Sequence, residues 1–134
     1  MGVEIAAATR RRQRLGRWGE AAAADFLRAR GLVVLATGYR CPQGEVDLVC
    51  RDGRWLVFVE VKTRLSRAAG APEEAVTRVK QRRLAAVANH FLVRHRLQGV
   101  PYRFDVVAVD VGLVGGVPAL PQIRHYRSAF TPPA

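Results

Sequence analysis

Two acidic residues and a lysine lie in strongly apolar surroundings, at a spacing suited to metal-dependent chemistry. Asp47 lies in the segment EVDLVCR (45–51), and Glu60 and Lys62 lie in LVFVEVKTR (56–64). Isolated charges inside hydrophobic strands are costly or have shifted pKa values. Carboxylates that share one place repel each other unless a proton or a cation intervenes, and Mg²⁺ prefers a few carboxylate oxygens with waters. The pattern favours a Mg²⁺ site, with Mn²⁺ as the substitute.

The segment 56–64 is predicted to be a central strand that aims two charges at one point. Apolar residues occupy both of its faces, as in a strand covered from both sides. Because side chains alternate along a strand, Glu60 and Lys62 share a face.

A hairpin is expected to bring the third group to the same face. The Asp-Gly pair at 52–53 is typical of a two-residue turn. With that turn, Asp47 lies opposite Phe58 and diagonal to Glu60, and Glu45 lies opposite Glu60.

A first helix, predicted for residues 15–30 and ended by Gly31, supplies one more acid. At about 100° per residue its other acid and most of its arginines crowd into one arc, whereas Glu20 lies in the apolar arc that faces the protein.

Two interpretations of these charges compete. One is a structural Glu60–Lys62 ion pair, with Glu45 and Asp47 at an exposed edge. The other is a functional site, which the joint displacement of Asp47, Glu60, Lys62 and Glu20 into apolar settings favours.

The remaining pattern predicts an α/β fold, with a central mixed sheet flanked by helices in the order α-β-β-β-α-β. Strands are expected at 32–40, 45–51, 56–64 and 102–111, with a weaker one near 119–127. The second helix is expected to begin at Pro72, with Glu73 and Glu74 in its first turn. Its apolar stripe would comprise Val76, Val79, Leu84, Val87, Phe91 and Leu92. A helix between the third and fourth strands predicts a right-handed parallel crossover. We expect a basic flexible arm at 1–13, one domain at 14–127 and a tail at 128–134.

Charge and composition narrow the class of partner. The chain has 134 residues, with 22 Lys and Arg against 11 Asp and Glu, and a formal net charge of +11. Such a balance favours nucleic acid as the partner. No apolar run approaches the roughly 20 residues of a membrane-spanning helix, and no secretory signal is visible. We therefore expect a cytoplasmic protein without a membrane partner.

Four blocks in order resemble a known family. They are GRWGEAAAADFL, GEVDLV, FVEVKTR and RFDVV. Together they are similar to the YraN family, also called UPF0102, over roughly residues 14–111. Asp47 followed by Glu60-Val61-Lys62 resembles the PD-(D/E)XK nuclease motif, and the family is related to archaeal Holliday-junction resolvases. The resemblance implies a restriction-endonuclease-like core. Val46 stands where the superfamily's name has proline, and TGYR stands where the family usually has an Asn.

The resemblance also implies roles for individual residues. Asp47 and Glu60 would be metal ligands together with the Val61 carbonyl, and Glu20 would assist the metal or a bound water. Lys62 would stand beside the attacking water. Phosphodiester hydrolysis would leave a 5′-phosphate and a 3′-hydroxyl.

Further basic residues are candidates for contacts with DNA phosphates. Lys80 lies on the apolar stripe of the second helix, where a snorkelling lysine is the alternative. The other candidates are Arg64, Arg10, Arg11, Arg12 and Arg14. A solvated arm is the alternative for the N-terminal arginines. Asp105 is expected to have a structural hydrogen-bonding role.

Two function hypotheses follow. The first is a Mg²⁺-dependent DNA endonuclease, with branched DNA as a fitting substrate, that would engage a two-fold junction as a homodimer. The second is a non-catalytic nucleic-acid-binding protein that retains the nuclease fold.

Overall fold

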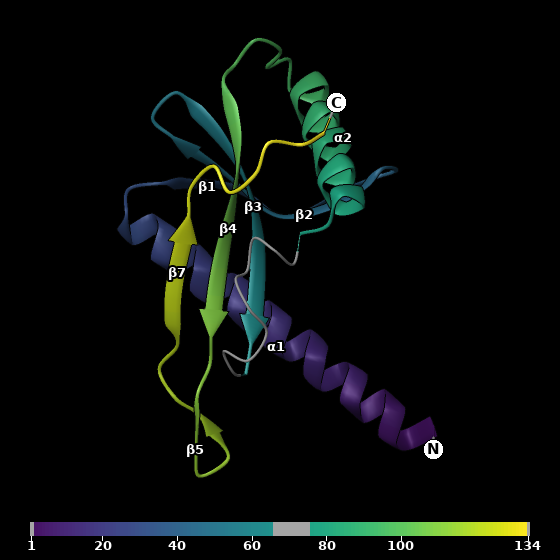
Figure 1. The fold of residues 1–134 in the computed structure, drawn as a ribbon, viewed down its shortest axis with the longest axis vertical. Coiled ribbons are helices and arrows are strands. Elements are labelled where there is room, and N and C mark those ends of the chain that lie inside the picture. Colours follow the sequence, from purple (N-terminus) through teal and green to yellow (C-terminus); the bar gives the residue numbers. More distant parts are fainter. Residues whose placement is uncertain (1, 66–75, 134) are drawn as a thin grey trace.

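The computed structural model describes residues 2–65 and 76–133, which form two helices and a five-stranded sheet beside a small hairpin (Figure 1). The helices are α1 (Gly2–Ala29) and α2 (Arg78–Arg94). The strands are β1 (Val33–Cys41), β2 (Gly44–Asp52), β3 (Trp55–Arg64), β4 (Tyr102–Asp110), β5 (Leu113–Val114), β6 (Val117–Pro118) and β7 (Gln122–Tyr126). The sheet order is β1-β2-β3-β4-β7, with β3 and β4 parallel and the other neighbours antiparallel. The expected α/β class with a mixed sheet is confirmed.

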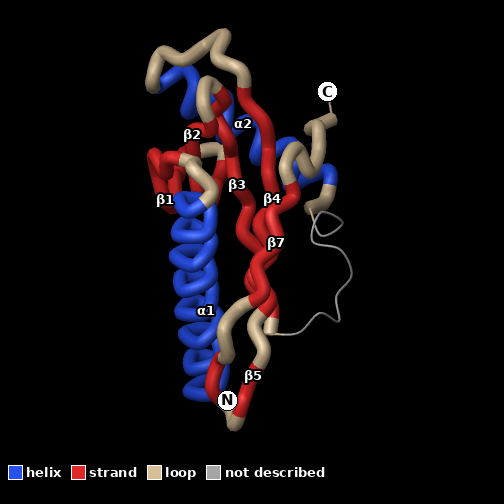
Figure 2. The backbone as a smooth tube through the Cα atoms, turned by 90° about the vertical axis from the view of Figure 1, so that its left-hand side faces the viewer, coloured by secondary structure: helices blue, strands red, loops and turns tan. Residues whose placement is uncertain are grey.

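The helices cover opposite faces of the sheet, as Figure 2 shows. Ala23 and Leu27 of α1 pack on Val57, Val59 and Val107 of the sheet. On the other face, Leu84, Val87 and Phe91 of α2 pack on Phe58 and Phe104. The alternation of β3 explains this arrangement, because its odd and even residues enter different cores. β3 is therefore the central strand that its two apolar faces predict.

Both helices begin at other residues than expected. α1 already begins at Gly2, so the segment expected to be an arm continues the helix, which projects beyond the sheet (Figure 1). α2 begins at Arg78, where the Thr77 side chain accepts the Lys80 N–H at 3.2 Å. The predicted start at Pro72, with Glu73 and Glu74, lies outside the described residues.

One member of the predicted apolar stripe of α2 does not face the core. Val79 is 55% exposed, whereas Leu84 is 4% exposed. Five residues along a helix correspond to about 140° of rotation, so Val79 points to a flank of α2 rather than to the sheet. None of the described helices has the length and apolar character needed to cross a membrane.

The β2–β3 hairpin is shifted by two residues from the predicted register. Asp52 pairs with Trp55 and Leu48 with Val59, so that Gly53 and Arg54 form the turn. Gly53 has a φ of +60° at the first turn position, which glycine adopts without steric cost.

The shift by an even number keeps every side chain on its expected face. Two predicted cross-strand pairs are nevertheless wrong. Asp47 is not opposite Phe58, because Val49 holds that place. Glu45 is not opposite Glu60; it pairs with Arg40 of β1 and is exposed.

The C-terminal residues pack on the sheet instead of leaving it as a tail. The Ala129 N–H donates to the Phe104 carbonyl at 2.9 Å, and the Phe130 ring stacks on Phe104 with 5.2 Å between centroids.

Candidate functional site

Asp47 lies where the pairing between β2 and β3 ends. The last paired residues are Leu48 and Val59. Beyond them the Val61 N–H donates to Asp47 Oδ2 at 2.7 Å. A side-chain carboxylate therefore takes the place of a backbone carbonyl beside β3, and this hydrogen bond holds Asp47 next to Glu60.

Glu60 is the most buried of the predicted site residues, with a side chain 9% exposed. Its Oε1 lies 2.5 Å from Lys80 Nζ and 3.6 Å from Lys62 Nζ. Two lysines from different elements thus meet one carboxylate. The structure brings Lys80, which the sequence offered as a secondary candidate, into the centre of the site.

A close approach of α1 to β3 places Glu20. A Cβ built on Gly19 would lie 1.8 Å from Thr63 Oγ1, so only glycine lets the helix come this near. The next residue, Glu20, comes close enough to Asp47 for its charge to raise the pKa of that acid. Beside it is a pocket of about 360 Å³, lined by Leu15, Gly16, Glu20, Val61, Lys62 and Thr63.

The acids of the site retain an excess of negative charge. Burial and the charge of Glu60 raise the pKa of Asp47 to about 7, even though the Val61 N–H opposes the shift. Burial also raises the pKa of Glu20, with further contributions from the charges of Glu45 and Glu60. Each acid is therefore hard to ionise while the others are charged.

The lysines respond to the same environment. Burial and the neighbouring Lys80 lower the pKa of Lys62. Burial opposes the charge on Lys80, but its hydrogen bonds and the charges of Glu60 and Asp47 together outweigh that effect and raise its pKa.

The donor chemistry of the site suits Mg²⁺. Within the described part of the chain, no three acidic, histidine or cysteine side chains form a ready-made metal centre. Mg²⁺ does not require one, because it is commonly held by one or two carboxylates with waters and substrate phosphates. Burial is the largest cause of the raised pKa of Asp47, and the charge of Glu60 adds to it; a bound cation would offset both. Asp47 and Glu60 would hold it, with the Val61 carbonyl.

The other predicted residues lie away from this cluster or are engaged elsewhere. The Arg64 guanidinium forms an ion pair with Asp110 at 3.1 Å. Arg10 and Arg14 are exposed on α1, and the side chains of Arg11 and Arg12 lie outside what the structure describes.

Asp105 has the structural role expected for it. Its side chain is fully buried and accepts hydrogen bonds from Arg103 Nε at 3.0 Å and the Ser128 N–H at 2.9 Å. His125 Nε2 lies 2.7 Å from its other oxygen. These contacts hold β7 and the C-terminal segment to β4.

Sequence reasoning missed the contact between Gly19 and Thr63. The signal was present, since a glycine in a helix interior is unfavourable unless something requires it. Gly16 shows why that signal is ambiguous, because nothing lies within 4 Å of a Cβ built there.

Comparisons with known proteins identify the family of the chain. The model of the uncharacterised protein family UPF0102 matches residues 19–109, which include Glu20, Asp47, Glu60 and Lys62. A UPF0102 protein of Roseiflexus castenholzii is 52% identical over 106 residues, covering 78% of this chain and 86% of that protein. UPF0102 protein STH1475 of Symbiobacterium thermophilum is 52% identical over 118 residues, covering 88% and 97%. A UPF0102 protein of Anaeromyxobacter dehalogenans is 48% identical over 119 residues, covering 89% and 85%. The chain therefore belongs to the UPF0102 family.

Proposed function

We propose that this protein is a Mg²⁺-dependent endonuclease that hydrolyses phosphodiester bonds in DNA. The observation that carries the proposal is the convergence of Asp47, Glu60 and Lys62 at the point where β2 leaves β3. The same three residues form the motif that resembles PD-(D/E)XK nucleases.

Each residue has a chemical task in this reaction. Asp47, Glu60 and the Val61 carbonyl bind the cation, which when bound supplies charge compensation and activation of water. Lys62 lies beside Glu60 and orients the attacking water. Glu20, whose charge acts on Asp47, can accept a proton from the water. Lys80 offsets the negative charge that develops on the phosphate oxygens.

The charge of the chain supports DNA as the substrate. A net charge of +11 attracts a polyanion, and the exposed arginines of α1 extend the basic surface beyond the sheet. A homodimer would place two such sites on a two-fold branched junction, so that a second copy of the chain is part of the proposal.

One observation favours a second candidate, a nucleic-acid-binding protein without catalysis. Glu60 already has two lysines at 2.5 and 3.6 Å, and an ion pair of this kind needs no metal. The raised pKa of Asp47 argues for the nuclease, because a purely structural site gains nothing from a carboxylate that resists ionisation.

Cleavage assays with matched variants decide between the two. Linear, flapped and four-way DNA is incubated with protein and Mg²⁺, Mn²⁺ or chelator. We expect metal-dependent cleavage that Asp47→Ala and Lys62→Ala abolish without weakening DNA binding. Glu45→Ala is the matched control, because Glu45 is an exposed acid of β2 paired with Arg40 at 2.9 Å.

The outcomes separate clearly. DNA binding without cleavage of any substrate would favour the second candidate. Full activity in Asp47→Ala would refute the assignment of the site. Equal losses in Asp47→Ala and Glu45→Ala would show that the assay reports general charge rather than this cluster.

A further inference from the structure

Helix α2 is unusually basic and carries this charge next to the proposed site. The sequence of α2 contains Arg78, Lys80, Arg82, Arg83 and Arg94, and it contains no acid. Since Lys80 contacts Glu60, α2 borders the proposed site directly.

One flank of α2 continues from the site as a regular stripe. Val79, Arg83, Ala86, His90 and Val93 recur at intervals of four and three residues, which places them on one side of the helix. Val79 and Val93 are 55% and 51% exposed, so apolar side chains lie open at both ends of the stripe.

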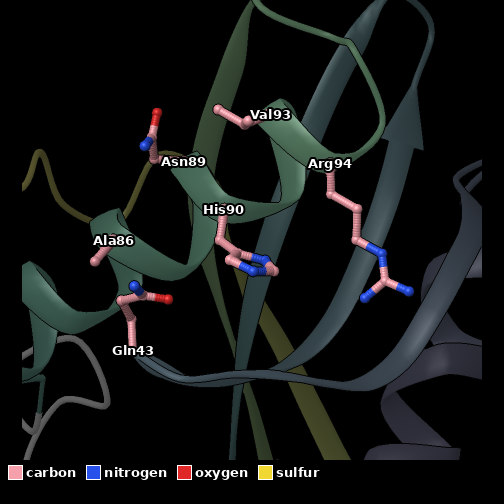
Figure 3. Close-up of a pocket in the computed structure, with 6 residues that line it drawn as sticks. All are labelled: Gln43, Ala86, Asn89, His90, Val93 and Arg94. Carbon is pink, nitrogen blue, oxygen red and sulfur yellow. The ribbon is translucent and has the colours of Figure 1, made fainter.

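Two neighbouring pockets lie between this flank and the turn that joins β1 to β2. The pocket next to the site has a volume of about 430 Å³ and includes Lys80, Arg83 and Glu45 in its lining. The second has a volume of about 520 Å³ and is lined by Gln43, Ala86, Asn89, His90, Val93 and Arg94 (Figure 3). Gln43 in one and Gly44 in the other are consecutive, so the two pockets follow one another along α2.

The chemistry of the second pocket suits a nucleobase. Figure 3 shows His90 directed between α2 and the strands, with Gln43 on the same side of α2 and the guanidinium of Arg94 at one side, whereas the Asn89 carboxamide lines the pocket from the other side of the helix. The Tyr39 hydroxyl lies 2.6 Å from His90 Nδ1 and fixes the imidazole. The carboxamides of Gln43 and Asn89 offer the paired donor and acceptor that match the edge of a base. The imidazole ring and the aliphatic side chains can contact the face of a base, and the guanidinium of Arg94 can bind a phosphate.

A base within a duplex cannot enter such a pocket, because both of its faces are stacked. Only an unpaired nucleotide presents its faces and edges together. The helix advances about 21 Å from Lys80 to Arg94. That length corresponds to about six nucleotides of stacked strand.

We propose that the flank of α2 binds an unpaired DNA strand, and that the pocket at Gln43, Asn89 and His90 holds one of its bases. The inference rests on the proposed function, since it specifies the substrate of that site as DNA with single-stranded segments beside the cleaved bond. The cleaved phosphate would then lie near Lys80, while the distal base is held near Arg94.

Binding in chelator tests the inference apart from catalysis. Fluorescence anisotropy is measured with a single strand, a blunt duplex of the same length and a duplex with a single-stranded tail. The wild-type protein should prefer the single strand and the tailed duplex. The double variant Gln43→Ala/Asn89→Ala should bind these about tenfold more weakly, with blunt-duplex affinity nearly unchanged. Gln122→Ala, which removes an exposed carboxamide on β7, is the matched control and should bind like the wild type.

The result that overturns the inference is equal affinity of the wild type for paired and unpaired DNA, or an equal loss on both in the double variant. A loss in Gln122→Ala as large as that in the double variant would also overturn it. Absence of a preference for unpaired DNA would refute the base-binding pocket and leave the proposal of metal-dependent cleavage standing. A preference for unpaired DNA without cleavage would refute the nuclease and support the pocket. The two proposals therefore fail separately.

Discussion

Replacing Gly19 by alanine should disturb the site, because it forces α1 away from β3. The added Cβ would lie 1.8 Å from Thr63 Oγ1, 2.8 Å from Thr63 Cβ and 2.9 Å from Thr63 Cγ2. Rotation about χ1 moves the first and third atoms, but the Cβ is fixed to the backbone of β3. Since non-bonded carbons pack best about 3.5–4.0 Å apart, α1 or β3 must move by several tenths of an ångström or more.

The energetic consequence follows from overpacking. Forced shifts of this kind in a packed interior cost about 1–3 kcal/mol, against a gain of under about 1 kcal/mol in helix propensity. Gly19→Ala should therefore lower the free energy of unfolding, measured by urea titration, by about 1–2 kcal/mol. Displacement of α1 also moves Glu20 away from Asp47. The rate of cleavage by the folded protein should therefore fall, in addition to the loss of folding stability.

Gly16→Ala is the matched control in the same helix. Nothing lies within 4 Å of its added Cβ, so the substitution should stabilise the protein by about 0.5–1 kcal/mol. Thr63→Ala should partly rescue Gly19→Ala, because it removes Oγ1 and Cγ2 but leaves the Cβ. Equal stabilisation by both glycine substitutions would refute the close approach of α1 to β3.

Three further predictions concern the buried charges. The fold raises the pKa of Asp47 from 3.8 to about 7, so that Asp47 ionises first in the unfolded chain and the folding stability falls as pH rises from about 4 to 7. Asp47→Asn should therefore stabilise the chelator-treated protein at pH 8 and not at pH 4, measured by the midpoints of urea unfolding. Equal effects at the two pH values would contradict this prediction. Burial opposes ionisation of Asp105, but hydrogen bonds from His125, Arg103 and the Ser128 N–H lower its pKa, so its stabilisation is present above about pH 4 and is lost as pH falls below it. Asp105→Asn should cost about 3–5 kcal/mol at pH 7 and less at pH 3 in thermal unfolding, and a pH-independent loss would show that the charge is irrelevant. Lys80→Met removes the positive charge nearest Glu60. Calorimetry should therefore show tighter Mg²⁺ binding, while the rate of cleavage falls about a hundredfold. An unchanged affinity for Mg²⁺ would mean that Lys80 and the metal do not compete for Glu60.

The sequence predicts the faces of the strands better than their pairing. Alternation in β3 places Glu60 and Lys62 together whatever the partner strand does, and the structure brings them within 3.6 Å. The hairpin register depends on which residues of the turn take left-handed conformations, and Gly53 can serve at either turn position. The predicted pairing was therefore wrong by two residues, although Asp47 kept its face.

Helix starts and the contribution of α2 were harder to foresee. The helical pattern of α1 weakens before Leu15 in the sequence, so its continuation to Gly2 could not be predicted from a hydrophobic period. Lys80 has the ordinary position of a snorkelling lysine in the sequence. Its contact with Glu60 depends on how α2 crosses β3, which is a tertiary property.

The two aspartates buried in valine-rich strands show what separates a functional acid from a structural one. In the sequence, Asp47 and Asp105 have similar neighbours, and burial alone would raise the pKa of both. Asp105 has Arg103 and His125 as hydrogen-bond partners, so its pKa falls and its negative charge is stabilised within the fold. Asp47 receives one backbone N–H and the repulsion of Glu60, so its pKa rises and its charge remains uncompensated. A fold gains stability from the first arrangement and loses it with the second. The unbalanced acid is therefore the one that we propose binds a cation.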